Sequence, residues 1–126
     1  MESRVCDQQL PDTLIVPATM TVGLVSAAVE GWEVLRECDW NDLRKMRDTA
    51  CRTGLAAQTD EADELVDLCK TMMEVVELGL KRRKLGEEEL LAPLWRRLRN
   101  MECPADGARN LFEDKGLEAL LEARQL

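Results

Sequence analysis

A mainly α-helical fold with one short N-terminal β-strand is predicted by this sequence, and three observations indicate it. Leucine is the commonest residue, at 20 positions, whereas isoleucine occurs once and aromatic residues make up 3% of the 126 residues. Leucine favours helices, while β-branched and aromatic residues favour sheets. From Pro17 onward apolar residues also recur at spacings of three and four, which is the helical period. We therefore expect about six helices between about residue 17 and residue 125, in one domain spanning residues 1–126.

Residues 2–7 are the exception to the helical pattern. Side-chain character alternates from Glu2 to Asp7, which is typical of a short strand, and the stretch from Gln8 to Asp12 would end it. An isolated strand leaves backbone N–H and C=O groups unpaired, and no later segment is an obvious partner. We therefore expect this strand to pair with polypeptide that the chain does not contain.

The first three helices are predicted from the signals at their ends. Proline is favoured in a first helical turn, so a helix should begin near Pro17. Gly31 is expected to separate it from a second helical turn, and a third helix should run from an N-cap at Asn41 to a stop at Gly54. The apolar residues that set these periods are Met20, Leu24, Ala27, Ala28, Trp32, Leu35, Leu43, Met46 and Ala50.

The clearest helix is expected from Thr59 to about Lys84. Acidic residues crowd its first turn and four cations its last, which complements the helix dipole, and Gly86 is its expected C-terminal cap. The apolar stripe of this helix is Leu65, Leu68, Cys69, Met72, Val75, Val76 and Leu80.

Three further helices are expected after Gly86. The first should have a kink or a delayed start at Pro93, because proline lacks a backbone donor. Pro104 should begin a short helix that Gly116 ends, and a last helix should cover Leu117 to Gln125.

Composition excludes several classes of function. The net charge of −8 argues against nucleic-acid binding, which needs an excess of cations, and no stretch approaches the length of a membrane span. The absence of histidine excludes Ser-His and Cys-His nucleophile pairs. Five cysteines without a paired spacing fit reduced, buried thiols and a cytoplasmic location.

The basic cluster Lys81–Lys84, followed by Arg96, Arg97 and Arg99, has two interpretations. It could bind a phosphate or an acidic partner, or it could complement a helix end and face the acids of residues 87–89. The second is favoured, because these acids would neutralise most of the field.

Methionine and tryptophan side chains also have two interpretations. Met72 and Met73, with Met46 and Met101, could line an adaptable groove for a partner. Their helical spacing favours core filling instead. Trp32, Trp40 and Trp95 are likewise expected to supply large buried area.

The predicted strand carries the strongest candidate for chemistry. Glu2, Arg4 and Asp7 form E-x-R-x-x-D, and on a strand Glu2 and Arg4 point to the same face. A carboxylate can hold a hard divalent cation such as magnesium, and an arginine can bind phosphate oxygens with two parallel hydrogen bonds. The pair suits a nucleotide site, although a surface ion pair would have the same sequence.

The order of short motifs along the chain resembles the C-terminal part of glutamate–cysteine ligases of the plant and bacterial type, which include related carboxylate–amine ligases. After E-x-R-x-x-D come residues 16–24 (VPATMTVGL), 38–41 (CDWN) and Gly54-Leu55. Residues 76–83 (VELGLKRR), Glu88, Leu91, Pro93-Leu94 and residues 103–106 (CPAD) are similar to the closing helices of that family.

The resemblance implies an ATP-dependent reaction in which the γ-carboxylate of glutamate is phosphorylated and the amine of cysteine then attacks. It implies that Glu2 is a magnesium ligand in the ATP site and that Arg4 contacts the phosphates, as both cofactor-binding and catalytic residue. Asp7 would have only a supporting role at the strand end.

The chain is several times shorter than these ligases. It has no glycine-rich phosphate loop and no second cluster of metal-binding acids. We therefore expect a C-terminal piece whose helices support a missing N-terminal ligase portion, and which is inactive alone. The alternative is an acidic helical adaptor or regulatory protein that binds a partner protein through exposed apolar faces.

Overall fold

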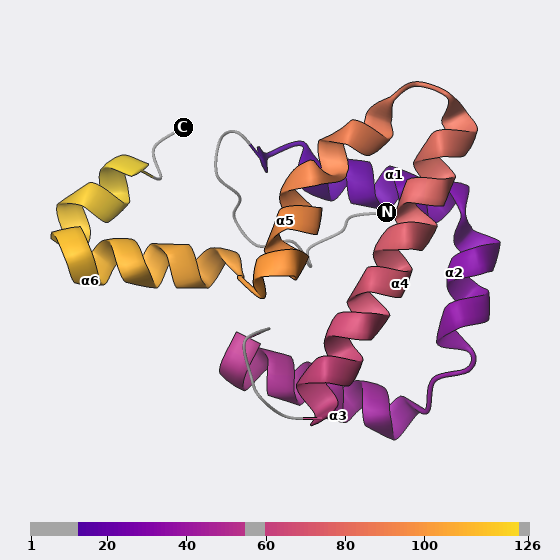
Figure 1. Cartoon of the computed structure of the whole chain (residues 1–126), viewed down its shortest axis with the longest axis horizontal. Coiled ribbons are helices and arrows are strands. Elements are labelled where there is room, and N and C mark those ends of the chain that lie inside the picture. The colour runs from indigo at the N-terminus through magenta and orange to yellow at the C-terminus, as the bar shows by residue number, and fades with distance from the viewer. Residues whose placement is uncertain (1–12, 55–59, 124–126) are drawn as a thin grey trace.

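The computed structural model describes residues 13–54 and 60–123, and these residues form a helical array (Figure 1). The α-helices are α1 (Val16–Ser26), α2 (Ala28–Leu35), α3 (Trp40–Thr53), α4 (Asp60–Arg83), α5 (Ala92–Asn100) and α6 (Pro104–Ala123), with a 3-10 helix η3 (Glu87–Leu91) before α5. The mainly α-helical prediction is confirmed. The strand expected at residues 2–7 lies outside the described residues, and none of the residues described is in a strand.

Helix α4 is the centre of the array and contacts α1, α2, α3, η3 and α5 (Figure 1). Its buried residues recur every three or four positions, so one face of the helix enters the core. The core cluster consists of Met73, Val76, Leu80, Leu91 and Leu98, with Met20, Val22, Leu24, Cys69, Leu94 and Trp95 packed against it. Three elements beyond α4 thus contribute to one apolar centre.

The stripe predicted for α4 is correct in its C-terminal half only. Val75, Val76 and Leu80 are buried, whereas Leu65, Leu68, Cys69 and Met72 are half-buried. In the N-terminal half the buried residues are Ala62 and Val66. Because the helix is apolar around much of its circumference, periodicity alone did not show which side its neighbours cover.

The break between the first two helices lies at Ala27, four residues before the expected position. Ala27 has φ −126° and ψ 36°, which are not helical angles. Gly31 instead lies inside α2 and is buried, and a Cβ there would contact the Met72 and Val75 side chains at 3.7 Å. Gly31 therefore lies where α2 contacts α4, with room for a methyl group, and it does not end a helix.

The N-cap of α3 also differs from the prediction. The side chain of Asp39, rather than Asn41, accepts hydrogen bonds from the backbone N–H groups of Asn41 (2.8 Å) and Asp42 (3.4 Å). Aspartate is as good an N-cap as asparagine, so the sequence allowed both. The predicted stop at Gly54 is confirmed, since its φ is +67°.

The segment between α4 and α5 confirms one expectation and corrects another. A 3-10 helix precedes α5 and Pro93 lies in the first turn of α5, which is the expected delayed start. The residue directly after α4 is Lys84, which is left-handed (φ 57°), so the cap of α4 lies two residues before the expected position at Gly86. Gly86 (φ 71°) is instead the N-cap of η3.

Helix α6 extends away from the other helices (Figure 1). It is divided at Gly116, whose φ of 81° and ψ of −176° are not helical, as the sequence predicted. None of the side chains described in α6 is buried. None of the helices in the described ranges combines the length and apolar content needed to cross a membrane.

Candidate interaction surface

The residues predicted to bind magnesium and ATP lie outside the part of the chain that the structure describes. Glu2, Arg4 and Asp7 all fall within residues 1–12. Within the described ranges, no group of three or more cysteine, aspartate or glutamate side chains is placed to hold a metal ion. The predicted magnesium and ATP site stays a prediction.

The basic cluster at the end of α4 is engaged in ion pairs with carboxylates of the same chain. Lys81 pairs with Glu77, Arg82 with Glu30 of α2, and Arg83 Nε with Glu87 Oε2 at 2.6 Å. Hydrogen bonding to these carboxylates raises the pKa of all three cations. This arrangement supports the interpretation that the cluster complements a helix end and its acidic neighbours.

Glu77 also joins α4 to α5. Its Oε2 accepts a hydrogen bond of 3.2 Å from Nε1 of Trp95, while its Oε1 pairs with Lys81. Trp95 packs against the core cluster, so its indole nitrogen needs a partner as it leaves water. Of the three tryptophans expected in the core, Trp95 alone is found there.

Exposed apolar side chains lie along the end of α1 and the outer side of α2. Val25 is 73% exposed, Val29 72% and Trp32 64%. The one buried residue of α2 is Gly31, which faces α4, so the larger side chains of this short helix are left on the outside. We call Val25, Val29 and Trp32 the α2 face.

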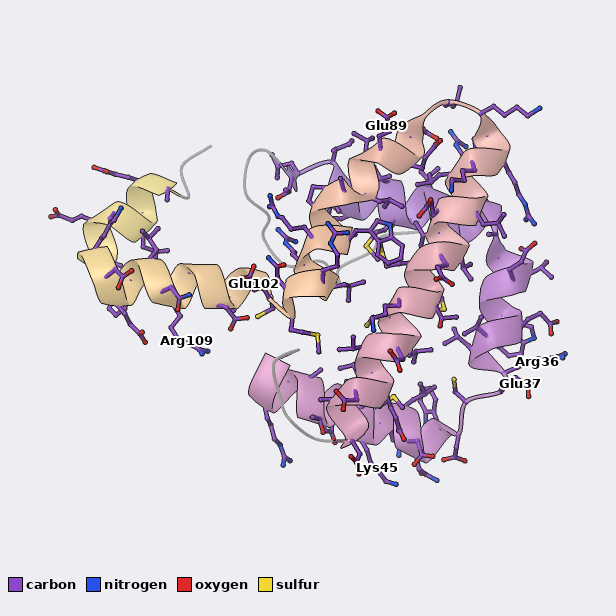
Figure 2. The ribbon with its side chains drawn as sticks, viewed as in Figure 1. Arg36, Glu37, Lys45, Glu89, Glu102 and Arg109 are labelled. Carbon is purple, nitrogen blue, oxygen red and sulfur yellow. The ribbon has the colours of Figure 1, made fainter. Side chains whose placement is uncertain are left out.

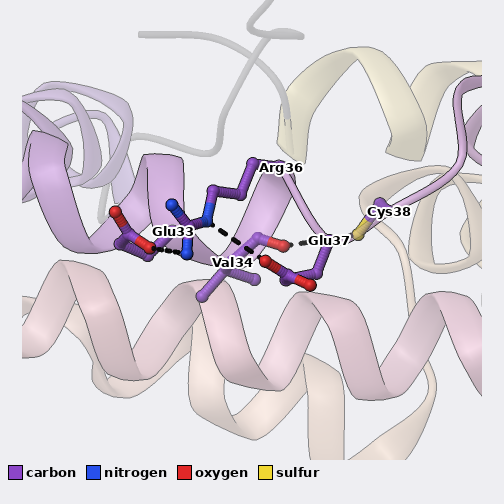
Figure 3. Close-up of polar contacts among 5 residues, drawn as sticks. All are labelled: Glu33, Val34, Arg36, Glu37 and Cys38. Carbon is purple, nitrogen blue, oxygen red and sulfur yellow. Dashed lines mark hydrogen bonds and ion pairs between the residues drawn. The ribbon is translucent and has the colours of Figure 1, made fainter.

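A polar network lies at the C-terminal end of α2 (Figure 3). Arg36 Nη2 contacts Glu33 Oε2 at 2.8 Å, and its Nε contacts Glu37 Oε1 at 3.1 Å. The Cys38 thiol donates to the Val34 carbonyl at 3.5 Å. Exposed ion pairs contribute little to stability, so this network is not a structural anchor.

The exposure of Trp32 and Trp40 corrects the prediction that both supply buried area. Trp40, at the start of α3, is 66% exposed, and the guanidinium of Arg44 lies 5.7 Å from its ring centroid. Trp32 precedes the charged Glu33 and Trp40 precedes the polar Asn41, but a polar neighbour is too common a signal to have revealed their exposure. The α2 face was therefore missed at the sequence level.

The cysteines are also less buried than expected. Cys38, Cys69 and Cys103 are half-buried and Cys51 is exposed, and all four are free thiols. Burial raises the pKa of the Cys69 thiol, which makes it a poor nucleophile. Cys6 lies outside the described residues.

A cavity of about 230 Å³ lies between α3 and the start of α4. Its lining side chains are Asp42, Lys45, Met46, Asp60 and Glu64. Lys45 is paired with Asp42 at 2.8 Å, and Met46 is the one apolar side chain of the lining. Ligand pockets are usually lined mainly by apolar and aromatic groups, so this cavity does not resemble a small-molecule site.

Comparison with known proteins identifies no relative of this chain. The chain matches no protein-family model, no curated protein and no solved structure.

Proposed function

We propose that this chain is a helical module that docks through its α2 face onto the N-terminal portion of an ATP-dependent carboxylate–amine ligase related to the glutamate–cysteine ligases. Two independent observations support the proposal. The first is the exposed apolar surface at Val25, Val29 and Trp32. The second is the order of ligase-like motifs along the sequence.

The α2 face carries the docking part of the proposal. A single exposed apolar residue is ordinary on a protein surface. Val29 and Trp32 are three positions apart on α2 and so lie side by side, and exposed apolar groups of this kind are typical of interaction sites. Tryptophan is among the commonest hot-spot residues, and truncating one at an interface costs about 2 kcal/mol or more. Trp32 is therefore the side chain on which binding should depend most.

The resemblance carries the chemical part of the proposal. It assigns a magnesium ligand to Glu2 and a phosphate contact to Arg4, and ATP and magnesium would supply the phosphoryl group and the balancing charge. The described residues offer no metal-binding group, so the remaining ligands and the pockets for glutamate and cysteine would come from the N-terminal portion. The helices then act as a support for the segment that carries Glu2 and Arg4.

Co-expression with an N-terminal portion of a glutamate–cysteine ligase tests this function. We expect the two polypeptides to co-purify and to form γ-glutamylcysteine from ATP, glutamate and cysteine, whereas the 126-residue chain alone forms none. Glu2→Gln and Arg4→Ala should abolish turnover while leaving co-purification unchanged. Turnover by the chain alone, or a complex whose turnover survives both substitutions, would refute the assignment.

An acidic adaptor or regulatory protein is the second candidate. The α2 face favours it as well, because that surface does not depend on residues 1–12. The two candidates differ in what they bind. An adaptor would fold stably without the ligase portion and would not bind it, whereas the ligase module should be stabilised by that portion. Thermal unfolding of the chain with and without the ligase portion distinguishes them, since a ligand that binds the folded state raises the melting temperature.

A further inference from the structure

Helix α6 is the part of the described chain with the fewest neighbours, and acidic residues outnumber basic ones in it. It carries five carboxylates and two cations. Three of its large apolar side chains are exposed, namely Phe112 (49%), Leu117 (58%) and Leu121 (55%), while Leu111 and Leu120 are half-buried. Gly116 divides α6 into two short helices, and isolated helices shorter than about 12–15 residues are marginal in water. The exposed apolar side chains of α6 therefore need a surface to pack on.

Helix α3 has a net positive charge, opposite to that of α6, and it carries an exposed stripe of aromatic and cationic side chains. It carries four cations and two carboxylates. Trp40, Arg44, Arg47 and Cys51 are spaced by four, three and four positions, which places them on one side of the helix, and all four are exposed. This α3 stripe begins with an aromatic ring and continues with two guanidinium groups.

The two surfaces are complementary in both apolar and charged groups. On α6, Leu117 and Leu121 are four residues apart, and Glu118 and Glu122 form an acidic row beside them. The α3 stripe offers Trp40 to the apolar row. It offers Arg44 and Arg47 to the acidic row, where Arg47 would exchange its exposed contact with Asp48 (2.8 Å) for a glutamate of α6. Two α6 helices would instead repel each other, since both carry excess negative charge.

Within one chain, α6 does not lie along α3. The Cys103 sulfur, just before α6, is 3.8 Å from where a Cβ on Gly54 would be, which places the start of α6 near the C-terminal end of α3. From there α6 extends away from the other helices (Figure 1), and Figure 2 shows Arg109 on α6 far from Lys45 on α3.

We propose that α6 of one copy packs along the α3 stripe of a second copy, and that the reciprocal contact closes a two-fold symmetric dimer. A two-fold axis generates both α6–α3 contacts from the same pair of surfaces. Neither α3 nor α6 is then left free to bind a third copy, and the assembly closes at two copies. This dimer uses α3 and α6, whereas the proposed ligase portion binds the α2 face, and either proposal can fail without the other.

A charge-swap experiment tests the dimer by sedimentation-velocity ultracentrifugation over a range of protein concentrations. The wild-type chain should show a monomer–dimer equilibrium that weakens about tenfold or more in high salt, because the charged contact is screened. Arg44→Glu/Arg47→Glu makes both surfaces acidic, and Glu118→Lys/Glu122→Lys makes both surfaces basic. Each variant alone should be monomeric, and an equimolar mixture should form dimers containing one copy of each.

Two controls keep the interpretation unambiguous. Glu74→Lys reverses an exposed charge on α4 and should leave dimerisation unchanged. Leu117→Ser/Leu121→Ser removes the apolar row without changing charge and should weaken the dimer at least tenfold, while far-ultraviolet circular dichroism checks that the body remains helical. A wild-type chain that stays monomeric, an open series of larger species, or a mixture that fails to dimerise would overturn the proposal.

Discussion

Gly23 of α1 and Gly79 of α4 lie backbone against backbone where the two helices cross. A Cβ on Gly79 would overlap the carbonyl oxygen of Gly23, and a Cβ on Gly23 would lie 2.6 Å from the carbonyl oxygen of Val76. Both glycines are buried. The absence of two side chains therefore sets how closely α1 packs on the central helix.

Gly79→Ala should destabilise the fold by about 1–3 kcal/mol, because the added methyl group meets backbone that cannot move aside. Chemical denaturation followed by circular dichroism measures the change. Gly31→Ala is the matched control, since its Cβ would make ordinary 3.7 Å contacts with Met72 and Val75. That control should gain about 0.5–1 kcal/mol, because alanine favours a helix more than glycine does. Equal effects of the two substitutions would contradict the close crossing.

Gly116→Ala should destabilise α6 locally by about 1–3 kcal/mol. Gly116 has φ 81° and ψ −176°, a region that side chains other than glycine rarely adopt. Gly107→Ala, at a helical position with open space around it, should instead stabilise α6 by about 1 kcal/mol. Amide hydrogen exchange over residues 104–123 reports both changes, and faster exchange in Gly107→Ala would count against this description of α6.

Lys84→Gly should raise stability by about 1 kcal/mol. Lys84 is left-handed, with φ 57°, and that backbone conformation costs a residue with a Cβ roughly 1–2 kcal/mol. Lys84→Ala removes the same charge but keeps the strain, so it should give no such gain. Thermal unfolding distinguishes the two variants. A gain of the same size in both would attribute the effect to charge rather than to backbone strain.

Glu30→Gln should reduce stability at neutral pH, and the difference from wild type should disappear in acid. The hydrogen bond from Arg82 holds the pKa of Glu30 below its ordinary value of 4.5. A carboxylate with a lowered pKa stabilises the fold above 4.5, and this stabilisation is lost as the pH falls through the folded-state pKa. Denaturant unfolding at several pH values from 7 to 3 measures the difference in free energy of unfolding between the wild type and the variant. Arg82→Gln should behave alike, and the double substitution should add little further loss at neutral pH.

The helix ends were predicted where proline and glycine determine the local backbone, and less well where tertiary contacts decide. Pro93 gave the delayed start of α5, and Gly54 and Gly116 gave two interruptions. Gly31 was wrongly expected to break a helix, because it lies inside α2 where that helix contacts α4.

Burial was harder to predict than secondary structure. The exposure of Trp32 follows from how little of α2 faces α4, and no local pattern encodes that. A hydrophobic period shows which residues share a side of a helix but not whether another element covers it. For Glu2 and Arg4, which lie outside the described residues, the assignment rests on the sequence alone.

The affinity of the 126-residue chain for an N-terminal ligase portion, measured by isothermal titration calorimetry, tests the central claim most directly. Loss of a hot-spot tryptophan should weaken binding about 30-fold in Trp32→Ala. Trp40→Ala removes a tryptophan that is equally exposed but lies off the α2 face, and it should bind as wild type does. Undetectable binding by the wild-type chain, or equal losses in the two variants, would contradict docking through the α2 face.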